Sequence, residues 1–255
     1  MKLGDLPWTH VRDALAATAP CVAILPCGAV EAHGPHLPLD TDVIISEAFA
    51  EAAAQMLNGD GVTAYVLPTL AYAPAEYASA FPGTIGLRAD TAEAALLDIA
   101  ASLKAQGFAC LAIANSHFDP TNVAMLREAV VKIERLGLPV AFPDFTRRAL
   151  AQTLTEEFIS GACHAGQFET SIVLTARPDL VDNDVRAVLP ANPESLTDAM
   201  RRGAKTFHDA GGPDAYFGTP AQASAAEGAA SIDLMARALV ETTRDKLGAW
   251  RIPAN

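Results

Sequence analysis

The sequence has little charge, few aromatic residues and no long apolar run. Charged residues make up 19% of the 255 positions and aromatic residues 6%, while apolar residues make up 51%. Because no window reaches the ~18 consecutive apolar residues of a transmembrane helix, we expect no membrane association. The apolar content excludes a disordered or fibrous chain. Low charge also leaves apolar surface that subunit contacts would cover, so we expect a homo-oligomer.

Positive charge is scarce as well. Thirty Asp and Glu stand against 18 Lys and Arg, which gives a net charge of −12. Such a field repels phosphate backbones, so we expect no nucleic-acid partner. The cysteines form no CxxC pair, and the first residues contain neither the apolar core nor the cleavage site of a signal peptide. We therefore expect reduced thiols and a cytoplasmic protein.

Short apolar runs alternate with stretches of helical periodicity along the first 160 residues. The apolar runs predict strands over residues 21–28, 62–73, 108–117 and 138–145. The periodic stretches predict helices over residues 44–57, 90–106, 120–136 and 146–159. This order is typical of an α/β fold, a parallel β-sheet sandwiched between helices in three Rossmann-like layers. The length suits a single domain over residues 1–255.

The chain after residue 160 is less regular. We expect two further helices there, over about residues 194–209 and 225–247. No GxGxxG motif opens a helix after any predicted strand, which argues against dinucleotide binding.

Metal-ligand types crowd the segment after the first predicted strand. Residues 31–42 contain one Glu, two His and two Asp, with Gly and Pro between them. Glu31 and His33 are two positions apart, so in an extended segment both side chains point the same way. Open α/β sheets bind ligands outside the carboxyl ends of their strands, and imidazole with carboxylate suits Zn, Mn, Fe or Ni. The alternative is a polar loop that bonds its own backbone, but the density of ligand types favours a metal site.

Two later segments add further ligand types. His117 and Asp119 follow the third predicted strand, again two positions apart, and a later segment contains His164 and Glu169. Each segment is weak evidence alone, and Asp119 before a proline also suits a helix N-cap. We expect His36 to orient a ligand or a loop carbonyl rather than bind metal.

Together these segments resemble the creatininase family, that is, creatinine amidohydrolase and its relatives. GAVEAHGPHLPLDTD at 28–42 is similar to the family signature G-S-x-E-Q-H-G-P-H-L-P-L-x-T-D. Further motifs follow in the family's order: FPGT at 81–84, NSHFD at 115–119, HAGQFETS at 164–171 and GTPAQASAAEG at 218–228. The resemblance implies a parallel α/β sandwich that assembles as a homohexamer, and two divalent metal ions per chain (Zn, Mn or Fe).

The resemblance also implies which residues bind the metals. Four positions match family ligands: Glu31, His33, Asp42 and His117. Asp42 takes the place of the carboxylate that bridges the two ions. Either Asp119 or Glu169 would complete the second site. Asp119 stands where creatinine amidohydrolase has a Glu ligand, and its side chain is one methylene shorter.

The implied activity is that of a metal-dependent amidohydrolase. His164 matches a catalytic or substrate-contacting His, and Glu169 is the second candidate catalytic residue. We expect a metal-activated water to cleave a non-peptide C–N bond of a small molecule such as a cyclic amide or a formamide. Cys163, Ala29 and Ala32 depart from the family pattern and argue against creatinine as the substrate. Trimming of a modified peptide and non-catalytic ligand binding are the alternatives.

Overall fold

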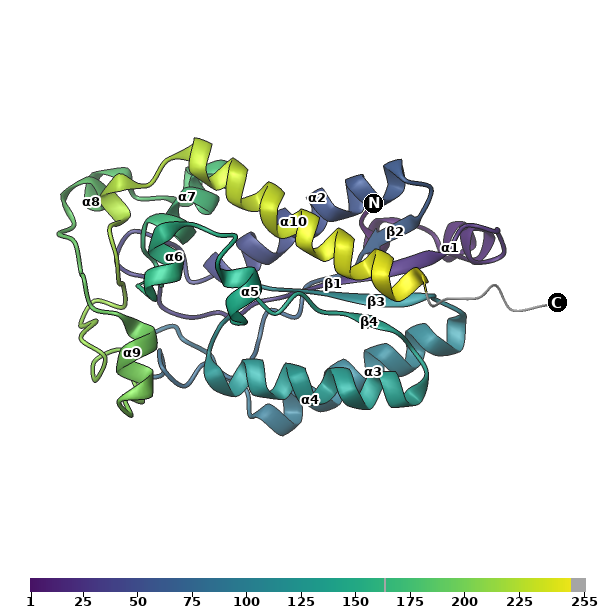
Figure 1. The fold of residues 1–255 in the computed structure, drawn as a ribbon, viewed down its shortest axis with the longest axis horizontal. Helices are drawn as coiled ribbons and strands as arrows, with labels where there is room; N and C mark the ends of the chain where they lie inside the picture. Colours follow the sequence, from purple (N-terminus) through teal and green to yellow (C-terminus); the bar gives the residue numbers. More distant parts are fainter. Residues whose placement is uncertain (163, 249–255) are drawn as a thin grey trace.

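A four-stranded parallel β-sheet runs through the molecule (Figure 1). The computed structural model describes residues 1–162 and 164–248. The strand order is β2-β1-β3-β4, and the strands are β1 (Cys21–Cys27), β2 (Thr63–Val66), β3 (Cys110–Asn115) and β4 (Val140–Ala141). Every residue of β1 and β3 is buried, which explains why these two strands are continuous apolar runs in the sequence.

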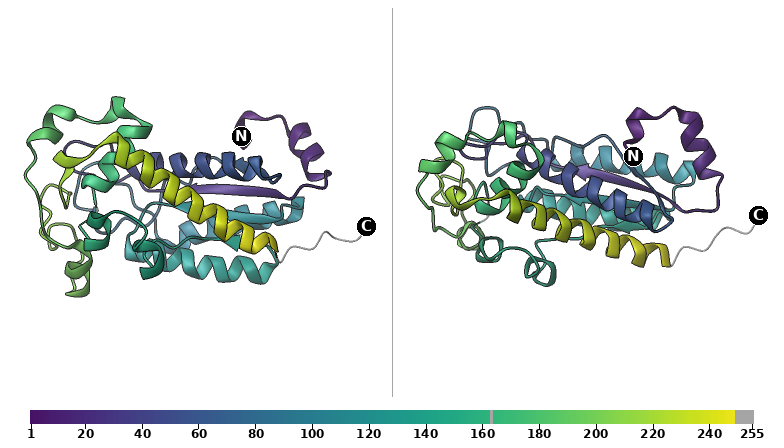
Figure 2. Two further views of the ribbon diagram at one scale, coloured as in Figure 1. Left: turned by 45° about the horizontal axis from the view of Figure 1, so that its top comes forward. Right: turned by 90° about the horizontal axis from the view of Figure 1, so that it is seen from above.

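Long helices cover both faces of the sheet (Figures 1 and 2). α2 (Thr41–Gly59) and α10 (Ala225–Gly248) cover one face, and α3 (Ala89–Gln106) and α4 (Pro120–Leu136) cover the other. Alternate residues of β1 serve the two cores: Ile24 packs beneath α2 and α10, whereas Leu25 packs against α3 and α4. The predicted α/β fold class, a parallel sheet between two helical layers, is confirmed.

Shorter elements precede β1 and follow β4. They are η1 (Leu3–Asp5), α1 (Trp8–Leu15), α5 (Arg148–Ala151), α6 (Glu156–Ser160), α7 (Gln167–Ala176), η2 (Pro178–Leu180), α8 (Asn183–Val188), α9 (Leu196–Arg201) and η3 (Pro220–Gln222), where η marks a 3-10 helix. Figure 1 shows α6 to α9 gathered beyond the carboxyl ends of the strands. Among the described helices, none is long and apolar enough to cross a membrane.

Two predicted strands are much shorter than their apolar runs. The run at 62–73 forms strand only over Thr63–Val66, and the run at 138–145 only over Val140–Ala141. Proline explains both limits, because Pro68 and Pro143 follow these strands closely and have no N–H to donate to a neighbouring strand.

Two predicted helices are also wrong in extent. The stretch at 146–159 is divided into α5 and α6, since Thr155 caps a new helix by accepting a hydrogen bond from the N–H of Phe158. The stretch at 194–209 is helical only over Leu196–Arg201, and Gly203 follows with φ +98°, a left-handed conformation that ends a helix. The other predicted helices, α2, α3, α4 and α10, are confirmed to within about three residues at each end.

Candidate metal centre

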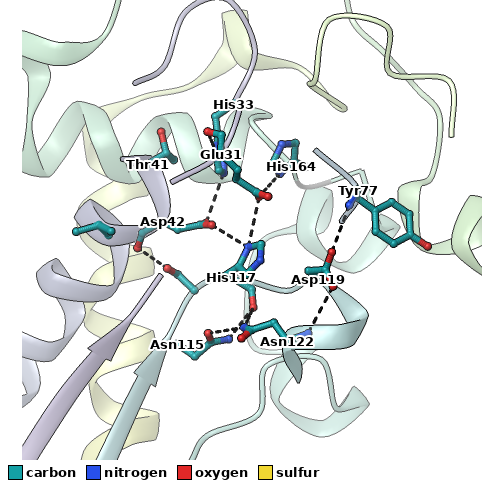
Figure 3. Close-up of polar contacts among 12 residues, drawn as sticks. Glu31, His33, Thr41, Asp42, Tyr77, Asn115, His117, Asp119, Asn122 and His164 are labelled. Atoms are coloured by element: carbon teal, nitrogen blue, oxygen red, sulfur yellow. Dashed lines mark hydrogen bonds and ion pairs between the residues drawn. The ribbon is translucent and has the colours of Figure 1, made fainter. Parts of the chain in front are cut away.

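Six ionisable side chains converge at the carboxyl ends of β1 and β3, and Figure 3 labels five of them, all except Glu169. They come from the loop after β1, the first turn of α2, the segment after β3, the turn before α7 and the first turn of α7. All six are between 1% and 7% exposed: Glu31, His33, Asp42, His117, His164 and Glu169. The structure therefore brings together side chains from three distant chain segments that the sequence had marked separately.

Backbone packing places Asp42 beside the end of β1. Gly28 directly follows that strand, and a Cβ at this position would lie 2.7 Å from the backbone nitrogen of Val43. The hydroxyl of Ser116, just after β3, donates to the carbonyl of Asp42 at 2.5 Å. A glycine at 28 thus allows α2 to begin directly against the strand ends.

Two amides hold the segment that carries His117. The Nδ2 groups of Asn115 and Asn122 each donate to the carbonyl oxygen of His117 at 2.9 Å. Asn115 is the last residue of β3 and Asn122 lies in the first turn of α4. The backbone at His117 is therefore fixed from both sides, as Figure 3 shows.

Each histidine ring of the cluster forms a hydrogen bond to a backbone carbonyl through one of its two nitrogens. Nδ1 of His33 lies 3.1 Å from the carbonyl oxygen of Glu31. Nε2 of His117 lies 2.6 Å from that of Pro74, and Nε2 of His164 lies 2.9 Å from that of Ala32. A carbonyl only accepts hydrogen bonds, so in a neutral ring the bonded nitrogen carries the proton. The opposite nitrogen of each ring then presents a lone pair to the cluster, as in histidines that bind metals.

These lone-pair nitrogens face carboxylate oxygens. Nδ1 of His117 lies 2.9 Å from Oδ2 of Asp42 and 3.4 Å from Oε1 of Glu31. Nε2 of His33 lies 3.4 Å from Oδ1 of Asp42 and 3.6 Å from Oε2 of Glu169. Within the described residues, neither Nε2 of His33 nor Oδ2 of Asp42 has a hydrogen-bond partner. A lone pair opposite a carboxylate is repulsive, so a positive charge between them is required.

The donor atoms found among the described residues form three groups: one contains Glu31, His33 and His164, and the other two share the carboxylate of Asp42. Of the two that share Asp42, Glu31 and His117 complete the first group and His33 and Glu169 the second, with the donor atoms of each group within 4.8 Å of one another. Ligands bound at about 2.0–2.2 Å to one tetrahedral ion lie about 3.3–3.6 Å apart, close to the distances between these atoms. The residues present therefore fit divalent cations, with one oxygen of Asp42 directed at each of the groups that share it.

The charges around the cluster also indicate that its carboxylates lack a cationic partner from a Lys or Arg side chain. No Lys or Arg lies within 4.0 Å of its three carboxylates in the part of the chain that the structure describes. Burial raises the pKa of Glu169 to about 8. Burial alone would lower the pKa of His33, but the carboxylates of Asp42, Glu169 and Glu31 together outweigh burial and raise this pKa to about 10. Buried carboxylates without a cationic partner take up protons for this reason.

Asp119 lies beside the cluster, with its oxygens engaged elsewhere. Oδ1 accepts a hydrogen bond from the N–H of Thr121 at 2.7 Å and caps α4, while Oδ2 accepts from the N–H of Glu76 at 3.1 Å. The donor groups found among the described residues do not include Asp119. The geometry therefore favours Glu169 over Asp119 as the residue that completes the second group.

Phe207 and Thr170 lie beside the cluster, although neither was predicted from the sequence as a site residue. The ring of Phe207 packs on His164 with centroids 4.2 Å apart, and His164 packs on His33 at the same distance. Nε2 of His36 lies 2.8 Å from the hydroxyl of Thr170, the neighbour of Glu169, so His36 contacts the residue next to a candidate ligand. Cys163, one of the departures from the family pattern, lies outside the described residues.

A cavity of about 650 Å³ opens onto the cluster. Its inner wall includes five members of the cluster: Glu31, Asp42, His117, His164 and Glu169. Its outer part is lined by residues of α4, α5, α6 and α9. A small molecule that enters this cavity therefore meets the candidate metal ligands at its inner end.

Comparison with known proteins gives concordant results. The Creatininase family model, described as creatinine amidohydrolase, matches residues 4–243. A mycofactocin precursor peptide peptidase of Mycobacterium ulcerans is 31% identical over 235 residues, 89% of this chain and 85% of that protein. Creatinine amidohydrolase of Pseudomonas putida is 29% identical over 198 residues, 71% of this chain and 74% of that protein.

Solved structures of creatininase share the fold. A manganese form has a TM-score of 0.75 at 27% identity and covers 96% of this chain and 97% of that one. A zinc–zinc form of a creatininase variant has a TM-score of 0.74 at 26% identity, with the same coverage of both chains.

Proposed function

Because the chain belongs to the creatininase family, we propose that it is a metal-dependent hydrolase that cleaves a C–N bond of an amide substrate. The observation that carries the proposal is the pair of buried donor groups that share Asp42. Glu31 and His117 would hold one cation with Asp42, and His33 and Glu169 would hold the other. When bound, divalent cations lower the pKa of coordinated water from 15.7 to ~7 and polarise a carbonyl oxygen.

We propose that His164 moves the proton in this reaction. Its Nε2 donates to the carbonyl of Ala32, so Nδ1 is the nitrogen that is free to accept a proton. Nδ1 lies on the cluster side, 3.9 Å from Oε1 of Glu31. The imidazole of His164 packs against the rings of both His33 and Phe207, and these two contacts hold its plane in place. His164 is thus positioned to receive a proton at the inner end of the cavity and to deliver it to the leaving nitrogen.

Two substrate classes follow from the comparisons. A small cyclic amide or formamide is the expectation from the sequence, and the creatinine amidohydrolase relative supports it. A peptide bond in a short peptide is the second candidate. Relatives named as peptidases support this candidate, as does a cavity of about 650 Å³, within the ~300–1,000 Å³ that holds drug-sized ligands. The buried donor set argues against a non-catalytic binding protein.

Metal analysis combined with a substrate screen tests the proposal. We expect protein supplied with Mn²⁺ or Zn²⁺ to bind the ion and to hydrolyse a member of a panel of lactams, hydantoins, formamides, creatinine and short peptides. Chelation should abolish turnover. His33→Ala should lose metal and turnover but keep its circular dichroism spectrum, whereas His10→Ala, at an exposed histidine of α1, should behave like wild type. Turnover that survives chelation, or an unchanged rate in His33→Ala, would refute this mechanism.

The assembly and domain organisation stay predictions. A homohexamer is expected from the family resemblance, and light scattering of the purified protein would measure it. A single domain over residues 1–255 predicts one cooperative unfolding transition.

A further inference from the structure

The outer part of the cavity carries the opposite charge from its inner end. Three arginines line the cavity: Arg127 of α4, Arg148 of α5 and Arg201 of α9. The acidic residues that line it are all in the metal cluster, apart from Asp119 beside the cluster. Negative and positive side chains are therefore segregated along the cavity.

Two of these arginines are oriented by aspartates that do not line the cavity. Nε of Arg127 donates to Oδ2 of Asp144 at 2.8 Å, and Nη1 of Arg201 donates to Oδ1 of Asp198 at 2.7 Å. Arg148 differs, since no carboxylate of the described chain lies within 4.0 Å of its guanidinium. Its charge is thus available to a molecule in the cavity.

This arrangement matters because the protein as a whole is acidic, with a net charge of −12. If cations satisfy the carboxylates of the cluster, as the proposed function requires, the remaining charged groups that line the cavity are the three guanidinium groups and Asp119, whose oxygens already accept hydrogen bonds from backbone N–H groups. A guanidinium presents a planar set of N–H donors that matches the two oxygens of a carboxylate. Local positive charge inside a negative protein selects anions at this one place.

We propose that the substrate is a carboxylate-bearing amide, whose anionic group binds Arg148 while its C–N bond lies at the metal cluster. A short peptide with a free carboxyl terminus belongs to this class, whereas creatinine does not. The proposal rests on the proposed function, because it needs cations to neutralise the inner end of the cavity.

Hydroxamates that carry a second functional group test this inference by binding rather than by turnover. A hydroxamate chelates divalent cations, so it anchors the probe at the cluster. We would titrate Mn²⁺-loaded protein with the monohydroxamates of succinic, glutaric and adipic acid and with their methyl esters, and measure affinity by calorimetry. We expect at least one acid to bind about tenfold more tightly than its ester, as a charge-assisted hydrogen bond allows. The difference should shrink with added salt.

Arg148→Gln should remove the preference for the acid and leave the affinity for the ester unchanged. Arg147→Gln is the matched control, because Arg147 is the neighbouring residue, is exposed and does not line the cavity. Its Nε lies 3.1 Å from Oδ2 of Asp144. Equal affinities of acid and ester at every chain length would overturn the inference while the proposed function stands. An unchanged preference in Arg148→Gln would overturn the assignment of this residue. Protein that binds neither Mn²⁺ nor any hydroxamate would refute the proposed function and, with it, the inference.

Discussion

Replacement of Glu157 by alanine tests whether one carboxylate holds together the loops around the candidate metal centre. Glu157 lies in α6, outside the cluster. Its Oε1 accepts a hydrogen bond from the N–H of Phe168 at 2.9 Å, and its Oε2 accepts from the N–H of Thr219 at 2.7 Å and from the hydroxyl of Thr219 at 3.2 Å. Phe168 is in the first turn of α7, directly before Glu169. The carboxylate therefore ties α6, the start of α7 and the loop at 219.

The structure sets the expected size of the effect. Alanine would leave the N–H groups of Phe168 and Thr219 without their acceptor, and a hydrogen bond to a charged group contributes about 1.5–3 kcal/mol. Glu157 is partly exposed, so water would replace some of this loss. We expect the free energy of unfolding to fall by about 2–4 kcal/mol. The affinity for Mn²⁺ should also fall, because the backbone beside Glu169 is released.

Urea denaturation and Mn²⁺ titration of Glu157→Ala would measure both effects. Glu156→Ala is the matched control, since Glu156 is also in the first turn of α6 but is exposed. We expect it to change stability by less than about 0.5 kcal/mol. If the two variants lost equal stability and bound Mn²⁺ equally well, the carboxylate of Glu157 would not have the role assigned to it.

Three further predictions concern packing, capping and metal. Gly228→Ala should lower the thermal midpoint by several degrees, which corresponds to a loss of about 2 kcal/mol or more, because the added Cβ would collide with the carbonyl of Ser171 where α10 packs on α7. Gly59→Ala is the control, since a Cβ at this position would meet open space and should leave the midpoint unchanged. Equal midpoints of the two variants would contradict this packing. Asp119→Ala should lose about 1–2 kcal/mol through the missing cap of α4 but keep the wild-type Mn²⁺ stoichiometry, and the loss of one ion would instead make Asp119 a ligand. Mn²⁺ at 100 times its Kd should stabilise the fold by about 2.7 kcal/mol in chemical denaturation, and no stabilisation would argue against a metal site in the buried cluster.

The sheet and the candidate ligands illustrate how far sequence patterns reach. β1 and β3 are buried on both faces, so each is a continuous apolar run, and the residues just after them were identifiable as lying at the carboxyl ends of a parallel sheet. Glu31, His33 and His117 stand in these positions, and the family motifs marked them together with Asp42. Their convergence follows from the pairing of Cys27 with Asn115 across the two strands.

The extents of elements near prolines and glycines were harder to predict. An apolar run indicates burial but does not show whether the backbone has a strand partner, so the strands predicted over 62–73 and 138–145 are both longer than the strands in the structure. The stretch at 194–209 shows the same difficulty for helices, because Gly203 suits a helix interior poorly but marks its end only once its left-handed φ is known.

The sequence by itself determined the layered α/β architecture and the residue types at the candidate metal centre, because burial and ligand chemistry are both recorded locally in the chain. Only the tertiary structure favours Glu169 over Asp119 as a ligand, since a carboxylate before a helix can serve as a cap or as a ligand, and in this fold backbone N–H groups reach both oxygens of Asp119. The packing of Phe207 against His164, the hydrogen bonds of Glu157 and the arginines of the outer cavity likewise depend on contacts between segments far apart in the chain. Such contacts leave no local pattern that a single sequence can reveal.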